Sequence, residues 1–378
     1  MSDSSFVATR SEAGLADSPG RRGDAVLDRS LGDVRPASHG PIYAALDLGT
    51  NNCRLLIARQ PGADAEAGTF RIVDSFCRIV RLGEGVATSG CLSEAAMERT
   101  VAALKICREK IHTRHVSRAR LVATEACRAA ANSDEFLRRV RHATGLELEI
   151  VDRETEAYLA TAGCSSLVDP DAEGTVLFDI GGGSSEIVWL ARERRNPLSR
   201  GQSPERALRD RIRGWRSMNV GVVRLAERFG GHTVTPEIFD AMVAHVGTEL
   251  VPFVDSVADQ TRCDRFHLLG TSGTVTTIAG VHLGLSRYDR RKVDGLWMSD
   301  AAISSTIAIL REMSFEERAL NGCIGPARAD LVLAGCAIFE AIRRAFPSDR
   351  VRIADRGLRE GILLGLMASD RMWSQDER

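Results

Sequence analysis

Two similar stretches decide the fold: residues 44–58, AALDLGTNNCRLLIA, and residues 178–190, FDIGGGSSEIVWL. In each stretch, apolar residues lead to an aspartate, a small polar turn follows, and apolar residues then resume. A pattern of this kind predicts two β-strands joined by a tight turn. Asp47 and Asp179 hold equivalent places, so we expect the same strand–turn–strand unit in both halves of the chain.

The composition is that of a globular protein. Of 378 residues, 44% are hydrophobic and 27% are charged, and the formal net charge is -1. This balance gives the whole chain no attraction for polyanions, so we expect neither a nucleic-acid nor a membrane partner. Nine scattered cysteines without a C-x-x-C pair, and no secretory signal or apolar run of about 18 residues, favour a reducing, cytoplasmic location.

The pattern along the chain predicts a flexible tail followed by two domains. Residues 1–40 are too polar to offset the entropy of ordering them, whereas strand and helix patterns alternate from Ile42 onward. We expect one domain over residues 41–162 and a second over 163–378. The apolar C-terminal helix within GILLGLMA is either core or a homodimer contact. Other expected elements are strands at 42–47, 54–59, 70–80 and 146–152, a helix after Asn132 with Glu135 as its capping partner, and a helix at 327–346.

An arginine-rich insertion interrupts the second half. Nine of the 25 residues from Arg192 to Arg216 are arginine, interleaved with proline and glycine. Two interpretations stay open. The segment is either a solvated loop, as charge runs usually are, or a cationic flap that helps to hold a polyanionic substrate.

The two turns have the chemistry of a phosphate site. Their small residues let backbone N–H groups converge on an anion, and the leading aspartates suit a divalent cation placed between carboxylate and phosphate. The alternative is two plain hairpins whose aspartates cap their own turns. The candidate phosphate-binding residues here are Gly49, Thr50, Asn51, Asn52, Gly181, Gly182, Gly183, Ser184 and Ser185.

A third glycine-rich turn follows in LLGTSGTVTTIAG. Its residues Gly270, Ser272, Gly273 and Thr274 stand between a predicted strand and a predicted helix. A helix N-terminus attracts anions, which makes this turn a third candidate for phosphate binding. The alternative is an ordinary tight connection between strand and helix.

The combination of ALDLGTNN, FDIGGGSSE and GTSGT, in this order and spacing, resembles the exopolyphosphatase/guanosine pentaphosphate phosphatase family. That family belongs to the superfamily of actin-like proteins, sugar kinases and heat-shock ATPases. The segments VATEACRAAANSDEFLRRV, IVDRETEAYLATAG, VGVVRLAERF and DRGLREGIL resemble further family segments, so the resemblance covers about residues 42–370. It implies an α/β fold of two RNase H-like domains with a cleft between them.

The resemblance also implies roles for individual residues. Glu156 matches the family's catalytic glutamate, a general base that takes a proton from the attacking water. Asp179 and Glu186 match acidic positions around the metal and the water, and Asp47 is a second contact to Mg²⁺. Arg128 matches an arginine beside the phosphate chain.

The sequence departs from the family in three places. The first turn continues Thr-Asn-Asn-Cys-Arg where relatives usually have Ser-Asn-Ser and an apolar or aromatic residue. The insertion at 192–216 is longer than in compact relatives. The chain stops at Arg378, without the further C-terminal helical region of long members, so we expect less processive digestion of long chains.

These observations predict a Mg²⁺-dependent phosphohydrolase that releases terminal phosphate from polyphosphate, from guanosine pentaphosphate, or from both. Three alternatives stay open at this point. They are a phosphatase of short polyphosphate or nucleotides, a weakly catalytic sensor of guanosine polyphosphates, and an actin-like ATPase or kinase.

Overall fold

The computed structural model describes residues 40–60, 69–192, 203–261 and 265–376, with side chains up to residue 370. The predicted tail, apart from residue 40, and residues 193–202 of the insertion lie outside the described residues. The division into domains 41–162 and 163–378 stays a prediction.

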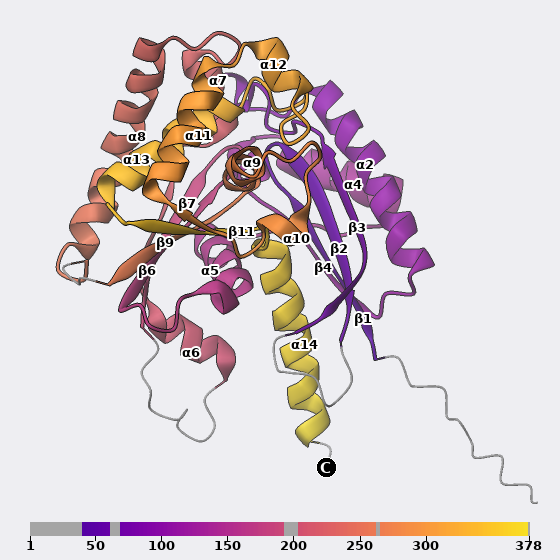
Figure 1. Cartoon of the computed structure of the whole chain (residues 1–378). Helices are drawn as coiled ribbons and strands as arrows, with labels where there is room; N and C mark the ends of the chain where they lie inside the picture. Colours follow the sequence, from indigo (N-terminus) through magenta and orange to yellow (C-terminus); the bar gives the residue numbers. More distant parts are fainter. Residues whose placement is uncertain (1–39, 61–68, 193–202, 262–264, 377–378) are drawn as a thin grey trace, which may run out of the picture. The chain divides into compact units, whose positions relative to one another are not determined.

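The first sheet has five strands in the order β3-β2-β1-β4-β5 (Figure 1). β1 and β2 form the antiparallel hairpin predicted from the first stretch, β3 extends it, and β4 and β5 run parallel to β1. The strands are β1 Ile42–Leu48, β2 Asn52–Arg59, β3 Arg71–Ile79, β4 Arg118–Ala123 and β5 Glu149–Ile150.

The second sheet repeats this order with one added strand. Its order β10-β11-β9-β6-β7-β8 contains an antiparallel β6–β7–β8 unit and parallel strands β9 and β11 beyond β6. The predicted α/β class is therefore confirmed, as two mixed sheets. The strands are β6 Gly174–Ile180, β7 Ser185–Ala191, β8 Ile212–Met218, β9 Phe266–Thr271, β10 Trp297–Ser299 and β11 Arg350–Ala354.

Helices connect the strands. Ser93, Thr235 and Ser299 are N-caps whose side chains accept a backbone N–H, as their sequence contexts predict. The helices of the described residues are α1 Val86–Ser89, α2 Glu94–Thr113, α3 Glu125–Ala129, α4 Ser133–Thr144, α5 Arg153–Cys164, the 3₁₀ turn Ser165–Leu167, α6 Pro204–Arg211, α7 Val222–Phe229, α8 Pro236–Val257, α9 Gly273–His282, α10 Arg290–Val293, α11 Asp300–Glu312, α12 Phe315–Leu320, α13 Val332–Ala345 and α14 Leu358–Asp376.

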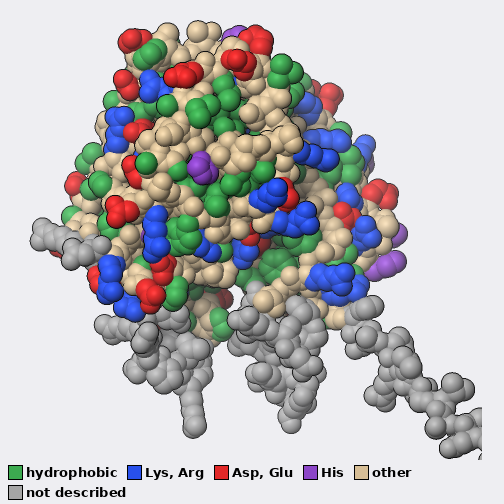
Figure 2. Space-filling view, in the orientation of Figure 1, with side chains coloured by type: hydrophobic (Ala, Val, Ile, Leu, Met, Phe, Trp, Pro, Cys, Tyr) green, Lys and Arg blue, Asp and Glu red, His purple; other side chains and the backbone are tan. Residues whose placement is uncertain are grey.

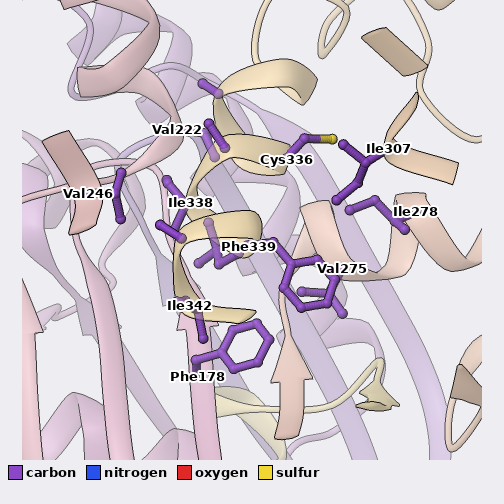
Figure 3. Close-up of a cluster of buried hydrophobic side chains, with 14 of the residues drawn as sticks. Phe178, Val222, Val246, Val275, Ile278, Ile307, Cys336, Ile338, Phe339 and Ile342 are labelled. Carbon is purple, nitrogen blue, oxygen red and sulfur yellow. The ribbon is translucent and has the colours of Figure 1, made fainter. Parts of the chain in front are cut away.

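The central strands of each sheet are buried on both faces, whereas the edge strands β3 and β8 are mostly exposed or half-buried. In the first sheet, Leu46 and Leu48 pack with residues of α2 and α4, whereas Tyr43 and Ala45 pack with residues of α14 on the opposite face. In the second sheet, Phe178 packs against the helical residues of the largest core, including Phe339 and Ile342 of α13 (Figure 3). Its opposite face meets α5. Such double burial explains why the strands read as nearly continuous apolar runs.

Several sequence expectations are wrong in detail. The Asn132 side chain does not cap α4, because its amide bonds instead with the backbone of Leu92. The strand expected at 146–152 is only Glu149–Ile150, which is the part that pairs with β4. The helix expected at 327–346 begins at Val332, after a series of turns.

The second part of the insertion is not a loop. Residues 204–211 form α6, which Ser203 caps, and residues 212–218 form the edge strand β8. β8 pairs with β7 along most of its length, so backbone pairing outweighs the charge of its arginines. The solvated-loop interpretation is therefore wrong for residues 204–216.

Candidate active site

A cavity lies between the two sheets, where β1 and β6 end in their turns. Its cavity volume is about 100 Å³, and it opens to solvent on one side. Its walls combine polar residues of both turns with residues of several helices. The polar and glycine residues that line it are Asp47, Gly49, Thr50, Asn51, Asn52, Arg54, Thr124, Glu125, Glu156, Asp179, Gly181, Gly182, Gly183, Ser184, Glu186, Gly273, Thr274, Thr277 and Arg328.

The two turns have the same backbone construction. The Gly49 N–H donates to the Asn52 carbonyl and the Gly181 N–H donates to the Ser184 carbonyl, both over 2.9 Å. In the strand registers, Asp47 lies directly opposite Arg54, and Asp179 directly opposite Glu186. Directly opposed residues share one face of a sheet, and all four of these line the cavity.

The triple glycine lets the second turn pack against the first. A Cβ atom on Gly182 would lie 3.0 Å from Cβ of Thr50, and one on Gly183 would lie 2.5 Å from Oγ1 of Thr50. In the described ranges no protein acceptor receives the N–H of Gly182 or Gly183. Close contact between turns therefore requires these glycines, and it leaves two N–H groups available at the cavity wall.

The two serines of the second turn already have acceptors. Ser184 donates its hydroxyl to Oε1 of Glu186 over 2.8 Å, and Ser185 donates to the carbonyl of Val220 over 2.6 Å. Ser184 lines the cavity, whereas Ser185 is buried beneath it. Their hydroxyls thus support the turn and orient Glu186.

The third turn contributes only part of its predicted residues. Gly273 and Thr274, at the start of α9, line the cavity. Ser272 caps that helix, because its Oγ accepts the N–H groups of Thr274 and Val275. Gly270 belongs to β9, where a Cβ would lie 2.5 Å from the ring of Phe178. Packing, rather than the cavity, explains that glycine.

Burial raises the pKa of three carboxyl groups that line the cavity. It raises the pKa of Glu186 to about 7, an effect that Asp179 increases and hydrogen bonds from Ser217 and Ser184 oppose. Burial also raises the pKa of Asp179 to about 6, although Arg54 opposes the rise. The pKa of Asp47 is raised by burial too, against Arg54, whose Nη1 lies 4.0 Å from the Asp47 carboxylate.

Glu156 is a further residue of the site whose pKa is strongly perturbed. Burial and the Glu186 carboxylate raise its pKa well above the ordinary value, while Arg128 lowers it. Arg128 donates from Nη2 to Oε2 of Glu156 over 2.6 Å. Glu156 lines the cavity, and Arg128 stands behind it, outside the lining.

Sequence reasoning missed two charged residues of the cavity. Glu125 directly follows the Thr-containing end of β4, and its place at the end of a parallel strand was the signal that could have identified it. Arg328 lies in a turn between α12 and α13, where no periodicity or motif marks it.

The carboxylates suit a metal held jointly with a ligand. No group of three or more His, Cys, Asp or Glu side chains placed to hold a metal occurs within the described ranges. Asp47 and Asp179 provide one carboxylate from each turn, and the buried Oδ1 atoms of Asn51 and Asn52 have no partner. An all-oxygen set with two carboxylates fits Mg²⁺, which retains waters and binds substrate oxygens.

The face of the molecule drawn in Figure 2 carries no large area of one charge sign. Figure 2 shows Lys and Arg interspersed with Asp and Glu over one face of the molecule, in agreement with the net charge of -1. None of the helices in the described parts of the chain has the length and apolarity that a bilayer span requires.

Comparison with known proteins identifies relatives of this chain. The chain is 29% identical over 334 residues to exopolyphosphatase 2 of Mycobacterium tuberculosis, which covers 85% of this chain and 98% of that protein. It is 28% identical to a bifunctional 3-dehydroquinate synthase/phosphatase of Fusobacterium nucleatum, but it spans only 46% of that longer protein.

Solved structures share the fold. The Aquifex aeolicus member of the Ppx/GppA family matches with a TM-score of 0.68 and 28% identity, over 87% of this chain and 98% of that one. An exopolyphosphatase from Cytophaga hutchinsonii matches with a TM-score of 0.75 over 87% of this chain and 98% of that one, and its 23% identity supports likeness of fold. The model of the Ppx/GppA phosphatase family matches residues 63–370, and the chain therefore belongs to that family.

Proposed function

We propose that the protein is a phosphohydrolase that releases the terminal phosphate of inorganic polyphosphate, guanosine pentaphosphate, or both. The observation that carries this proposal is the meeting of two equivalent turns and a perturbed glutamate, Glu156, around one cavity. Phosphoryl transfer depends mainly on positioning and charge neutralisation, and this cavity contains groups for both.

Glu156 is the proposed general base. Arg128 engages Oε2 of its carboxylate, which leaves Oε1 to accept a proton from a water at the cavity wall. That water attacks the terminal phosphorus, the bond from phosphorus to the bridging oxygen breaks, and the products are inorganic phosphate and a shortened chain. General-base assistance of this kind contributes about 10²–10⁴-fold to the rate.

The N–H groups of the second turn are proposed to hold the terminal phosphate. Gly182 and Gly183 line the cavity, and within the described residues their N–H groups have no protein acceptor. Glu186, which Ser184 and Ser217 orient through hydrogen bonds of 2.8 Å, is proposed to position the attacking water beside Glu156.

Two arginines support a substrate with several phosphates. A Cβ atom on Gly273 would lie 3.5 Å from Nη1 of Arg328 and 3.7 Å from Nη2 of Arg54. The guanidinium groups of Arg54, on β2, and of Arg328, in the turn between α12 and α13, thus converge at one wall of the cavity. An extended polyanion uses such a second positive site, whereas a simple phosphomonoester does not need it.

Mg²⁺ is the proposed cofactor, with Asp47 and Asp179 as its protein ligands. When bound, it would neutralise phosphate oxygens and thereby stabilise the charge of the transition state. Burial raises the pKa of both carboxyl groups against the opposing charge of Arg54, and a bound cation would favour their ionised forms.

The test is phosphate release, with Mg²⁺, from short polyphosphate, long polyphosphate and guanosine pentaphosphate in parallel. We expect release from at least one, and Glu156→Gln should abolish it while leaving ligand binding intact. Release from none of the three would overturn the proposed function. Undiminished turnover in Glu156→Gln would overturn the proposed mechanism but leave the proposed activity standing.

A further inference from the structure

Glu125 is the most heavily paired carboxylate beside the cavity. Its side chain is 3% exposed and lies against guanidinium groups of three different helices. Oε1 accepts from Arg224 of α7 over 3.0 Å and from Arg153 of α5 over 3.3 Å. Oε2 accepts from Nε and Nη2 of Arg128 over 3.3 and 3.1 Å.

Arg128 is held on three sides. Its Nη1 donates to the carbonyl of Val151 over 2.7 Å, and its Nη2 lies between Oε2 of Glu125 and Oε2 of Glu156. Because Nη2 serves both carboxylates, the position of Glu125 sets the orientation of the guanidinium plane that Glu156 meets.

We propose that Glu125 is a positioning residue, which fixes the guanidinium of Arg128 and, through it, the carboxylate of Glu156. This inference rests on the proposed function, in which Glu156 is the base. Glu125 keeps one edge of the guanidinium occupied. Without this bond, Arg128 is free to rotate toward Glu186 or toward an incoming phosphate, and it no longer presents Nη2 to Glu156.

A role confined to folding explains the arrangement less well. Moving ions out of water is unfavourable, and an apolar residue would fill the same space with a smaller loss of stability. The arrangement instead gathers three guanidinium groups on Glu125, and one of them, that of Arg128, also holds Glu156. Misplacing a reacting group by about 1 Å costs roughly 10²-fold in rate.

The test compares Glu125→Gln with Glu227→Gln. Glu227 offers a matched control, because it is an exposed residue of α7 that accepts the Gly85 N–H over 3.0 Å and likewise joins the two halves of the chain. We expect Glu125→Gln to lower kcat roughly 10²-fold with KM changed by less than about threefold. Glu227→Gln should leave both near wild type.

A double-mutant cycle tests whether Glu125 acts through Arg128. In an Arg128→Met background, Glu125→Gln should lower kcat no further, because the intermediary is already lost. Multiplicative losses in the cycle, or a wild-type kcat in Glu125→Gln, would overturn the positioning role. If Glu125→Gln does not fold, Glu125→Asp replaces it in the same cycle, since it retains the charge and shortens the reach.

An NMR measurement separates this inference from the proposed function. In protein labelled at arginine, the Arg128 Nη signals are assigned by their loss in Arg128→Lys. We expect restricted guanidinium rotation in the wild type and averaged signals in Glu125→Gln. Unchanged Arg128 signals in that variant would refute the positioning role whatever the activity, whereas an inactive wild type would refute the proposed function.

Discussion

The two hairpins of the cavity share a backbone but differ in charge. In β1–β2, Asp47 faces Arg54, whereas in β6–β7, Asp179 faces Glu186 at the equivalent register position. The first pair is close to neutral. The second gathers two carboxyl groups whose pKa values burial raises to about 6 and about 7. Two turns with the same backbone thus form two different walls of the cavity. The wall at β1–β2 can accept an anion, whereas the wall at β6–β7 is acidic and needs a proton or a cation to neutralise its carboxylates.

The largest expected effect is loss of turnover when the acidic pair is broken. Glu186→Gln preserves shape and removes the charge that we propose positions the water, so kcat should fall by about 10²-fold or more. Phosphate release at saturating substrate measures it, with thermal unfolding as the check on folding. A kcat within threefold of wild type would show that the acidic wall is not used in catalysis.

The same variant should change how stability depends on pH. The pKa of Glu186 rises from 4.5 to about 7 on folding, so the folded state binds more protons than the unfolded state between these values. The contribution of Glu186 to stability is therefore fully present below about pH 4.5 and is lost as the pH rises through about 7. Removing this group should raise stability at pH 8 by at most about 3 kcal/mol.

Urea unfolding at pH 5 and pH 8 measures this difference. The wild type should lose stability between the two values, and Glu186→Gln should lose less, because Asp179 still contributes its own share. An equal loss in both proteins would mean that Glu186 titrates as it does in the unfolded chain.

A methyl group added to each turn tests how tightly the two turns are packed. Gly183→Ala brings a Cβ within 2.5 Å of Thr50 Oγ1, so we expect a loss of about 1–3 kcal/mol. Gly49→Ala meets nothing nearer than 3.7 Å and should stay within about 1 kcal/mol of wild type. Urea midpoints of both variants measure the contrast. Equal losses would contradict close packing of the second turn on the first.

These glycines show what the sequence could and could not predict. The two matched stretches were enough to predict both hairpins and the equivalence of Asp47 with Asp179, because strand periodicity and turn chemistry are local. The α/β class was predicted from the alternation of strand and helix patterns along the chain. That Gly182 packs on Thr50 was not predictable, because the contact joins residues about one domain apart in sequence. Gly270 is similar, since its partner Phe178 lies on a neighbouring strand.

The charged residues follow the same division. Glu156 was singled out through a motif, but its pairing with Arg128 over 2.6 Å was not predictable from the sequence. Glu125 and Arg328 carry no periodicity of their own, and only the fold brings them to the cavity. In the insertion, charge predicted a loop, whereas the ladder with β7 makes residues 212–218 a strand.

The smallest expected effect concerns the pair Asp47 and Arg54 of the first hairpin. Arg54→Met removes the positive charge that lowers the pKa of both Asp47 and Asp179, so both carboxyl groups should ionise at higher pH. The acidic limb of the activity profile should therefore move to higher pH. KM for a polyanionic substrate should rise roughly tenfold. This is the expected loss when one hydrogen bond from a partly exposed guanidinium to a phosphate is removed.

Arg78→Met is the matched control, since Arg78 is an exposed residue of β3 that does not line the cavity. It should leave both KM and the acidic limb unchanged. If Arg54→Met lowers kcat as severely as Glu186→Gln does, the two walls are equally catalytic and the contrast between the hairpins fails. If it changes only KM and the acidic limb, the first hairpin binds and tunes charge while the second supports the chemistry.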